Sequence, residues 1–125
     1  MSDYVIWHNP KCSTSRYVLA AMNEAGVDVT VRDYQKQPPD ADELRQALAR
    51  LDVPPRALLR RKNTPYDELG LGDGSLSDDA LIDAMAAHPI LIERPVVFGP
   101  VSAIIARPKE AVHDWLAQQQ DPRPA

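Results

Sequence analysis

The sequence predicts a single α/β domain spanning residues 1–125, built on a mixed four-stranded sheet, with a helical subdomain inserted at about residues 37–87. Near the N-terminus the pattern runs strand, helix, strand, an order that requires two parallel strands joined by a crossover. Near the C-terminus two short strands flank the turn Gly99-Pro100 and a helix follows, which indicates an antiparallel pair. The stretch between these two patterns has helical periodicity.

The N-terminal pattern consists of two predicted strands around one predicted helix. Residues 4–8 are rich in β-forming side chains and predict a buried strand. Residues 14–25 predict a helix, and Gly26 stands at its C-terminal stop position. The apolar stripe of this helix consists of Val18, Leu19 and Met22. Residues 27–34 alternate between apolar and polar side chains, which predicts the second strand.

The inserted stretch predicts three helical segments and one loop. The first helix opens at Asp40 and carries an apolar face at helical spacing. That face consists of Leu44, Leu48 and Leu51. Residues 56–62 predict a short helical turn, and the polar, glycine-rich residues 67–75 predict a loop. Ser77 caps a further helix, which ends at His88 because a proline follows it.

The C-terminal pattern predicts a hairpin and a last helix. Residues 96–98 and 101–106 form the expected strand pair. Pro108 fits the first position of a helix over residues 109–119, and we expect the tail 121–125 to fray. The complete order of elements resembles a thioredoxin or glutaredoxin fold that carries a helical insertion.

Charge and hydropathy exclude two classes of partner. The net charge of −4 at pH 7 argues against nonspecific binding to nucleic acid, because such binding needs a basic face. No run approaches the roughly 20 apolar residues of a membrane span, and the N-terminus lacks the features of a signal peptide. We therefore expect a soluble, cytoplasmic protein without nucleic-acid or membrane partners.

The chain contains one cysteine, Cys12, and cannot form an internal disulfide. A secreted domain of this size normally carries an even set of cysteines, so the single thiol favours a reducing compartment. One cysteine and three scattered histidines lack the spacing of metal ligands, which argues against a zinc site.

Cys12 lies between a predicted strand end and a predicted helix start, in the loop of residues 8–16. The unsatisfied N–H groups of a first helical turn and the helix dipole stabilise a negative charge at such a place. A thiolate there can have a pKa well below that of a free thiol, and the thiolate is the nucleophile. Lys11 and Arg16 add positive potential.

A structural role for Cys12 and two roles for His8 need to be weighed. Free cysteine is among the most buried residue types, but the neighbours of Cys12 are Lys, Ser, Thr, Ser and Arg, which do not suit a core. We therefore interpret Cys12 as reactive. His8 either polarises the thiolate as an imidazolium or is a strand-end histidine bonded to backbone, and the sequence leaves both open.

The spacing around Cys12 excludes two well-known thiol chemistries. Tyrosine phosphatases use a Cys-x5-Arg loop, whereas here the residue six positions after the cysteine is Val18 and Arg16 comes four positions after it. Thioredoxins and glutaredoxins use Cys-x-x-Cys, but Ser15 stands at the second position. A resolving thiol must therefore come from outside the chain.

Three sequence blocks occur in order along the chain. The first contains His8-Asn9-Pro10, Cys12 and Thr14-Ser15-Arg16. The second contains Arg56-Ala57-Leu58-Leu59-Arg60, Pro65-Tyr66 and Leu69-Gly70-Leu71. The third contains His88-Pro89-Ile90-Leu91-Ile92, Arg94-Pro95 and Arg107-Pro108. With these blocks the sequence resembles the ArsC-type arsenate reductases, which use glutathione and glutaredoxin, over about residues 4–115.

The resemblance implies a reaction and a set of site residues. It implies that the Cys12 thiolate attacks arsenic, with glutathione as co-substrate, glutaredoxin as partner and no bound cofactor. The implied catalytic arginines that surround the oxyanion are Arg60, Arg94 and Arg107. The implied substrate-binding residues are His8, Asn9, Ser15 and Arg16. Guanidinium groups suit such a site independently of the resemblance, because they stay charged and present a planar fork of donors.

The prolines after two of these arginines carry a further expectation. In thioredoxin-like folds a cis-proline starts the third strand and faces the active cysteine, and Pro95 occupies that place. The resemblance therefore implies that Arg94 lies next to Cys12. The sequence itself leaves the cis or trans state of the Arg94-Pro95 bond open.

Two alternative functions remain at the level of sequence. Spx-type regulators share the fold and bind RNA polymerase, but many of them rely on a Cys-x-x-Cys switch, which this chain lacks. A thiol oxidoreductase acting on another substrate, such as a glutathionylated compound, would use Cys12 without requiring the three arginines. Fold and nucleophile alone do not decide between substrates.

Overall fold

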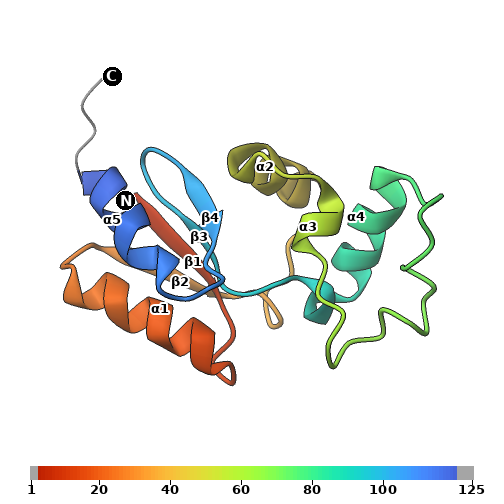
Figure 1. The fold of residues 1–125 in the computed structure, drawn as a ribbon, viewed down its shortest axis with the longest axis horizontal. Coiled ribbons are helices and arrows are strands. Elements are labelled where there is room, and N and C mark those ends of the chain that lie inside the picture. The colour runs from red at the N-terminus through yellow and green to blue at the C-terminus, as the bar shows by residue number, and fades with distance from the viewer. Residues whose placement is uncertain (1–2, 121–125) are drawn as a thin grey trace. The chain divides into compact units, whose positions relative to one another are not determined.

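The computed structural model describes residues 3–120, so the expected fraying of residues 121–125 lies outside the described part of the chain. Within it, the predicted mixed four-stranded sheet is confirmed, with strand order β2-β1-β3-β4 (Figure 1). The strands are β1 (Tyr4–His8), β2 (Val29–Asp33), β3 (Val96–Phe98) and β4 (Ala103–Ile105). No helix in these residues is long and apolar enough to cross a membrane.

Two compact units make up the chain. One contains the residues up to Tyr34 and those from Arg94 onward, and it holds the whole sheet. The other unit is Gln35–Glu93, and the predicted insertion of residues 37–87 falls inside it. Each unit has its own set of packed apolar side chains.

The register of the sheet determines which loops meet at its edge. β1 pairs in parallel with β2, and His8 lies opposite Asp33. β1 pairs in antiparallel fashion with β3, and Trp7 lies opposite Val96. The segment that leads into β3 therefore runs beside the segment that follows β1, which brings Arg94 to the loop after His8.

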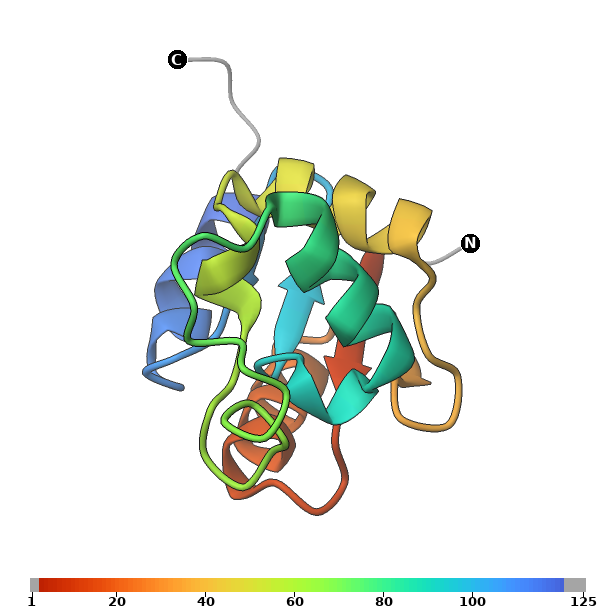
Figure 2. The same ribbon diagram turned by 90° about the vertical axis from the view of Figure 1, so that its right-hand side faces the viewer.

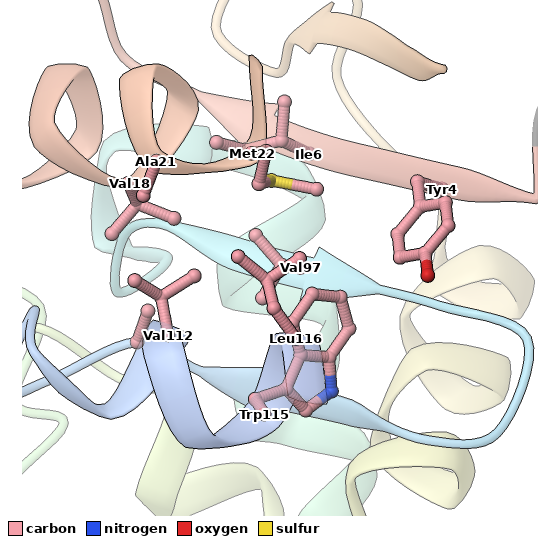
Figure 3. Packing of buried hydrophobic residues seen from close by; sticks show 10 residues of the cluster. Tyr4, Ile6, Val18, Ala21, Met22, Val97, Val112, Trp115 and Leu116 are labelled. Atoms are coloured by element: carbon pink, nitrogen blue, oxygen red, sulfur yellow. The ribbon is translucent and has the colours of Figure 1, made fainter. Parts of the chain in front are cut away.

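Helices α1 (Ser13–Glu24) and α5 (Ala111–Gln120) cover one face of the sheet (Figures 1 and 3). Alternate side chains of β1, Tyr4 and Ile6, point to this face because successive strand residues face opposite sides. The helices contribute Val18, Ala21, Met22, Val112, Trp115 and Leu116 to the same core. This packing fixes the axis of α1 and hence the position of its N-terminus.

The end of α5 is hydrogen-bonded to the turn between β3 and β4. The side-chain oxygen of Gln119 accepts hydrogen bonds from the backbone N–H groups of Val101 (2.8 Å) and Ser102 (3.0 Å). Its Nε2 donates to the hydroxyl of Ser102 at 2.9 Å. A Cβ atom added to Gly99 would lie 2.7 Å from the Gln119 oxygen, so this close approach requires glycine.

The last helix starts later than the sequence predicts. α5 begins at Ala111, and Pro108 lies in a preceding turn instead of at the first helical position. In this turn the backbone N–H of Ala111 donates to the oxygen of Pro108 at 3.0 Å, and that of Val112 donates to Lys109 at 3.2 Å. The Arg94-Pro95 and Arg107-Pro108 peptide bonds are both cis.

The second unit contains α2 (Ala41–Leu51), α3 (Pro55–Leu58), α4 (Asp78–Ala87) and the 3-10 helix η1 (Pro89–Leu91) (Figure 2). Asp40 and Glu43 form a capping box at the start of α2, since each side chain accepts from the other residue's backbone N–H. Ser77 caps α4 as the sequence predicts. The buried side chains of these helices include Leu44, Leu48, Leu58, Leu81, Ile82, Met85 and Leu91.

The predicted helical turn over residues 56–62 is wrong in its second half. α3 ends at Leu58, and Leu59 pairs in antiparallel fashion with Ile92. The backbone N–H of Arg60 donates to the oxygen of Leu91, and that of Glu93 donates to the oxygen of Leu58, both at 2.7 Å. A long-range backbone pairing of this kind outweighs the local helical preference, and residue periodicity does not reveal it.

Candidate active site

The loop after β1 is a tight turn that presents Cys12 at the start of α1. The backbone N–H of Cys12 donates to the oxygen of Asn9 at 3.0 Å, and that of Lys11 donates to the Asn9 side-chain oxygen at 3.0 Å. Cys12 itself is the N-cap residue of α1, with extended backbone angles. Its own carbonyl accepts from the N–H of Arg16 at 3.0 Å, so the helix begins directly after the thiol.

The surroundings of Cys12 favour its thiolate. Burial of this partly exposed thiol alone would raise its pKa. The backbone N–H of Ser15 and the guanidinium of Arg94 lower the pKa by hydrogen bonding to the sulfur, and the backbone N–H of Thr14 adds to them. The positive charge of Arg94 acts in the same direction, and the net pKa of Cys12 lies below its ordinary value.

Ser15 is fully buried, and its hydroxyl joins two segments. Its hydroxyl lies 2.6 Å from Nδ1 of His8 and accepts from the backbone N–H of Asn9 at 3.0 Å. A hydroxyl can accept one hydrogen bond and donate another, so the Ser15 hydroxyl donates to Nδ1 in the imidazole tautomer whose Nδ1 carries no proton. This network holds the end of β1, the loop and the first turn of α1 together.

His8 is buried, and its hydrogen bond goes to a side chain instead of to the backbone. Burial lowers the pKa of His8, the carboxylate of Asp33 opposes this shift, and the charge of Arg16 lowers the pKa further. With the net pKa below the ordinary value, the imidazole is mainly neutral at pH 7. An imidazolium that polarises the thiolate is therefore not the favoured state of His8.

Arg94 acts on the thiol, and Arg107 contacts the backbone of Arg94. The Nε and Nη1 atoms of Arg94 are buried, and the guanidinium acts on Cys12 as described above. Arg107 is exposed, and its Nε donates to the backbone oxygen of Arg94 at 3.0 Å. The second arginine thus contacts the backbone that carries the first.

The other predicted binding residues of this unit shape the loop. Arg16 is exposed, and its Nη1 donates to the backbone oxygen of Pro10 at 2.8 Å. Asn9 is buried, and both its backbone N–H and its side-chain oxygen take part in the hydrogen bonds described above. These contacts support the conformation in which the loop presents Cys12.

Arg60 belongs to the second unit, whereas the other seven predicted site residues belong to the first. Its Nη1 donates to the Oε1 of Glu93 at 2.9 Å, and its Nε donates to the backbone oxygen of Lys62 at 3.2 Å. Glu93 is not among the site residues that the sequence predicts. Glu93 directly precedes Arg94 in the sequence, which could have drawn attention to it. A single carboxylate at that position does not reveal which residue it pairs with.

The first unit thus provides a nucleophile and a cation in contact. A thiolate at a helix N-terminus next to a guanidinium can attack an electrophilic centre that carries negatively charged oxygens. No second thiol is present in the chain to resolve the product.

Comparison with known proteins gives a consistent result. The sequence profile of the ArsC family matches residues 7–115. An arsenate reductase of Escherichia coli is 45% identical over 120 residues, which cover 96% of this chain and 85% of that protein. An arsenate reductase of Rhizobium meliloti (strain 1021) is 49% identical over 111 residues, which cover 89% and 79%. The solved structure of an arsenate reductase from Vibrio cholerae superposes with a TM-score of 0.86 at 45% identity, covering 90% of this chain and 97% of that one.

Proposed function

Because the chain belongs to the ArsC family and is an arsenate reductase, an oxidoreductase, we propose that it reduces arsenate to arsenite by attack of the Cys12 thiolate on arsenic. Glutathione and glutaredoxin supply the reducing equivalents in this proposal. The observation that carries it is the position of Cys12 as N-cap residue of α1, where backbone N–H groups and Arg94 lower the pKa of the thiol.

In the first step a bond forms between the sulfur of Cys12 and arsenic, and an arsenic hydroxyl takes up a proton from solvent and leaves as water. The thiolate and the oxyanion repel one another, so the step needs cations placed where the negative charge lies. The contact between Arg94 and the sulfur supports a role for this guanidinium at the reacting centre. Arg107 and Arg60 complete the set of cations around the oxyanion.

The remaining steps need thiols from outside the chain. The sulfur of glutathione displaces a second oxygen and forms the other bond to arsenic. Glutaredoxin then attacks the glutathione sulfur, the electron pair of the broken sulfur–arsenic bond stays on arsenic, and arsenic(V) becomes arsenic(III). Water releases arsenite and regenerates the Cys12 thiol. The single cysteine supports this sequence, because an internal disulfide cannot form.

The other predicted binding residues have supporting roles in this proposal. His8, Asn9 and Ser15 hold the loop of residues 8–16 in shape, and their hydrogen bonds to one another support this assignment. Arg16 keeps the loop closed on Pro10 and adds positive potential for the anion. The reaction starts from a free Cys12 thiol, a form that the reducing cytoplasm preserves.

The test is arsenate-dependent consumption of NADPH, coupled through glutathione, glutaredoxin and glutathione reductase. We expect turnover by the wild type and none by Cys12→Ser. Substantial arsenate reduction by Cys12→Ser would rule out this nucleophile. Alkylation of Cys12 at neutral pH without arsenate turnover in the wild type would point to a different substrate for the same thiolate.

A further inference from the structure

We propose that Glu93 is a positioning residue that holds the guanidinium of Arg60 in the orientation in which it receives the oxyanion. The inference rests on the role proposed above for Arg60. It starts from the 2.9 Å contact between Oε1 of Glu93 and Nη1 of Arg60.

The Arg60–Glu93 ion pair is far more buried than the Arg61–Asp67 ion pair of the same unit. Its side chains are 15% and 20% exposed, whereas those of the Arg61–Asp67 pair are 72% and 70% exposed. Exposed pairs are screened by water and salt and contribute little to holding a side chain in place. A shielded, charge-assisted hydrogen bond is stronger and more directional.

The backbone fixes both partners of this pair. Leu59 and Ile92 form an antiparallel bridge, and the residues that follow them are Arg60 and Glu93. The N–H of Arg60 and the N–H of Glu93 each donate across this bridge at 2.7 Å. The two side chains therefore start from backbone positions that are tied together.

A second hydrogen bond defines the plane of the guanidinium. Nε of Arg60 donates to the backbone oxygen of Lys62 at 3.2 Å, while Nη1 donates to Glu93. A planar group held at two of its three nitrogens cannot rotate about its own axis without breaking one contact. Arginine has five N–H donors, so donors remain for an oxyanion while the two contacts persist.

Glu93 also has an opposing effect, because its negative charge repels the oxyanion. Glu93→Gln and Glu93→Ala both remove this charge, but only glutamine keeps an oxygen that can accept from Nη1. The difference between the two variants therefore reports positioning alone. The matched control is Asp67→Asn, which removes the carboxylate of the exposed pair with Arg61.

The experiment measures two quantities for each variant. The first is the concentration of inorganic arsenate that halves the rate of Cys12 alkylation by iodoacetamide, and the second is kcat for arsenate in the coupled assay. We expect Glu93→Ala to need about tenfold more arsenate for half protection than Glu93→Gln, with a lower kcat, as for the loss of one charge-assisted hydrogen bond. Asp67→Asn should behave as the wild type. Alkylation without arsenate should proceed at one rate in all variants, which shows that each is folded around an intact thiol.

The same substitutions in an Arg60→Ala background complete the test. There the difference between Glu93→Ala and Glu93→Gln should vanish, because Glu93 acts through Arg60. Equal protection of the two variants in the otherwise native chain, or a difference that persists without Arg60, would overturn the proposal, as would arsenate that protects none of the proteins. Protection by arsenate in a wild type that shows no turnover would contradict the proposed function and leave the positioning role to be decided by the protection values.

Discussion

His8 and His113 each form a hydrogen bond with a hydroxyl group of α1, but their surroundings differ. His8 meets Ser15 at 2.6 Å in a buried site. His113, on α5, meets Tyr17 at 2.7 Å on the surface, where the ammonium of Lys109 lies 5.0 Å from the centre of the Tyr17 ring. The two distances are similar, but the His8–Ser15 contact is shielded from water, whereas water can replace the His113–Tyr17 contact. The comparison teaches that burial, more than bond length, decides what a hydrogen bond contributes.

The largest effect is expected beside the buried contact, at Arg94. Arg94→Lys keeps one positive charge but loses the planar fork of donors that acts on the sulfur of Cys12. We expect kcat/KM for arsenate to fall by about tenfold to a hundredfold. Steady-state kinetics in the coupled assay measure this loss, and the rate of Cys12 alkylation across pH shows whether the thiol pKa rises with it. A lysine variant with full activity would show that the fork is not required.

Ser15→Ala should cause the next largest effect, on stability. The change leaves the buried N–H of Asn9 and the Nδ1 of His8 without their shared partner. We expect the free energy of unfolding to decrease by about 1–3 kcal/mol, the typical cost of an unsatisfied buried polar group. Urea denaturation monitored by circular dichroism gives this value. If the free energy of unfolding decreases no more than it does on loss of the exposed Tyr17–His113 hydrogen bond, the buried contact is not the stronger of the two.

The titration of His8 sharpens the comparison further. Its pKa is lowered in the folded protein, chiefly by burial, so the unfolded chain binds more protons between the folded pKa and the ordinary value of about 6.5. The stability that depends on neutral His8 is therefore complete above that ordinary value and is lost as the pH falls through it towards the folded pKa. Urea unfolding at a series of pH values should show this decline in the wild type and a flatter profile in His8→Gln. Parallel pH profiles of the wild type and His8→Gln would mean that His8 has the same pKa in the folded and the unfolded protein.

Tyr17→Phe should have the smallest effect. It removes the exposed hydroxyl and keeps the ring that packs edge-on against His113 at 5.7 Å. We expect the free energy of unfolding to change by no more than about 0.5 kcal/mol, as for surface substitutions. The same urea experiment serves as the measurement. A loss equal to that of Ser15→Ala would show that water does not replace this contact.

Local pattern was sufficient for most of the elements. β-forming residues located β1 and β3, and alternation located β2. The capping residues Asp40 and Ser77 located the starts of α2 and α4. The pattern failed where distant segments decide the backbone. Leu59 leaves the helical conformation because it pairs with Ile92, more than thirty positions later in the chain.

The candidate site shows the same division. Cys12 could be identified from its neighbours, and the resemblance to a known family led to Arg94 beside it, which the structure places at the sulfur. The contact of His8 with Ser15 and that of Arg60 with Glu93 could not be predicted. Each depends on two side chains meeting across the fold, and a linear pattern of residue types contains no such distance.

The hydrogen bonds of Gln119 set a practical limit for engineering the C-terminal end. This side chain closes the turn between β3 and β4 and lies against Gly99. A truncation that removes Gln119 would leave two backbone N–H groups of that turn to water and would open a gap over the glycine. Affinity tags and fusion partners are therefore best joined beyond this residue, where they leave the sheet intact.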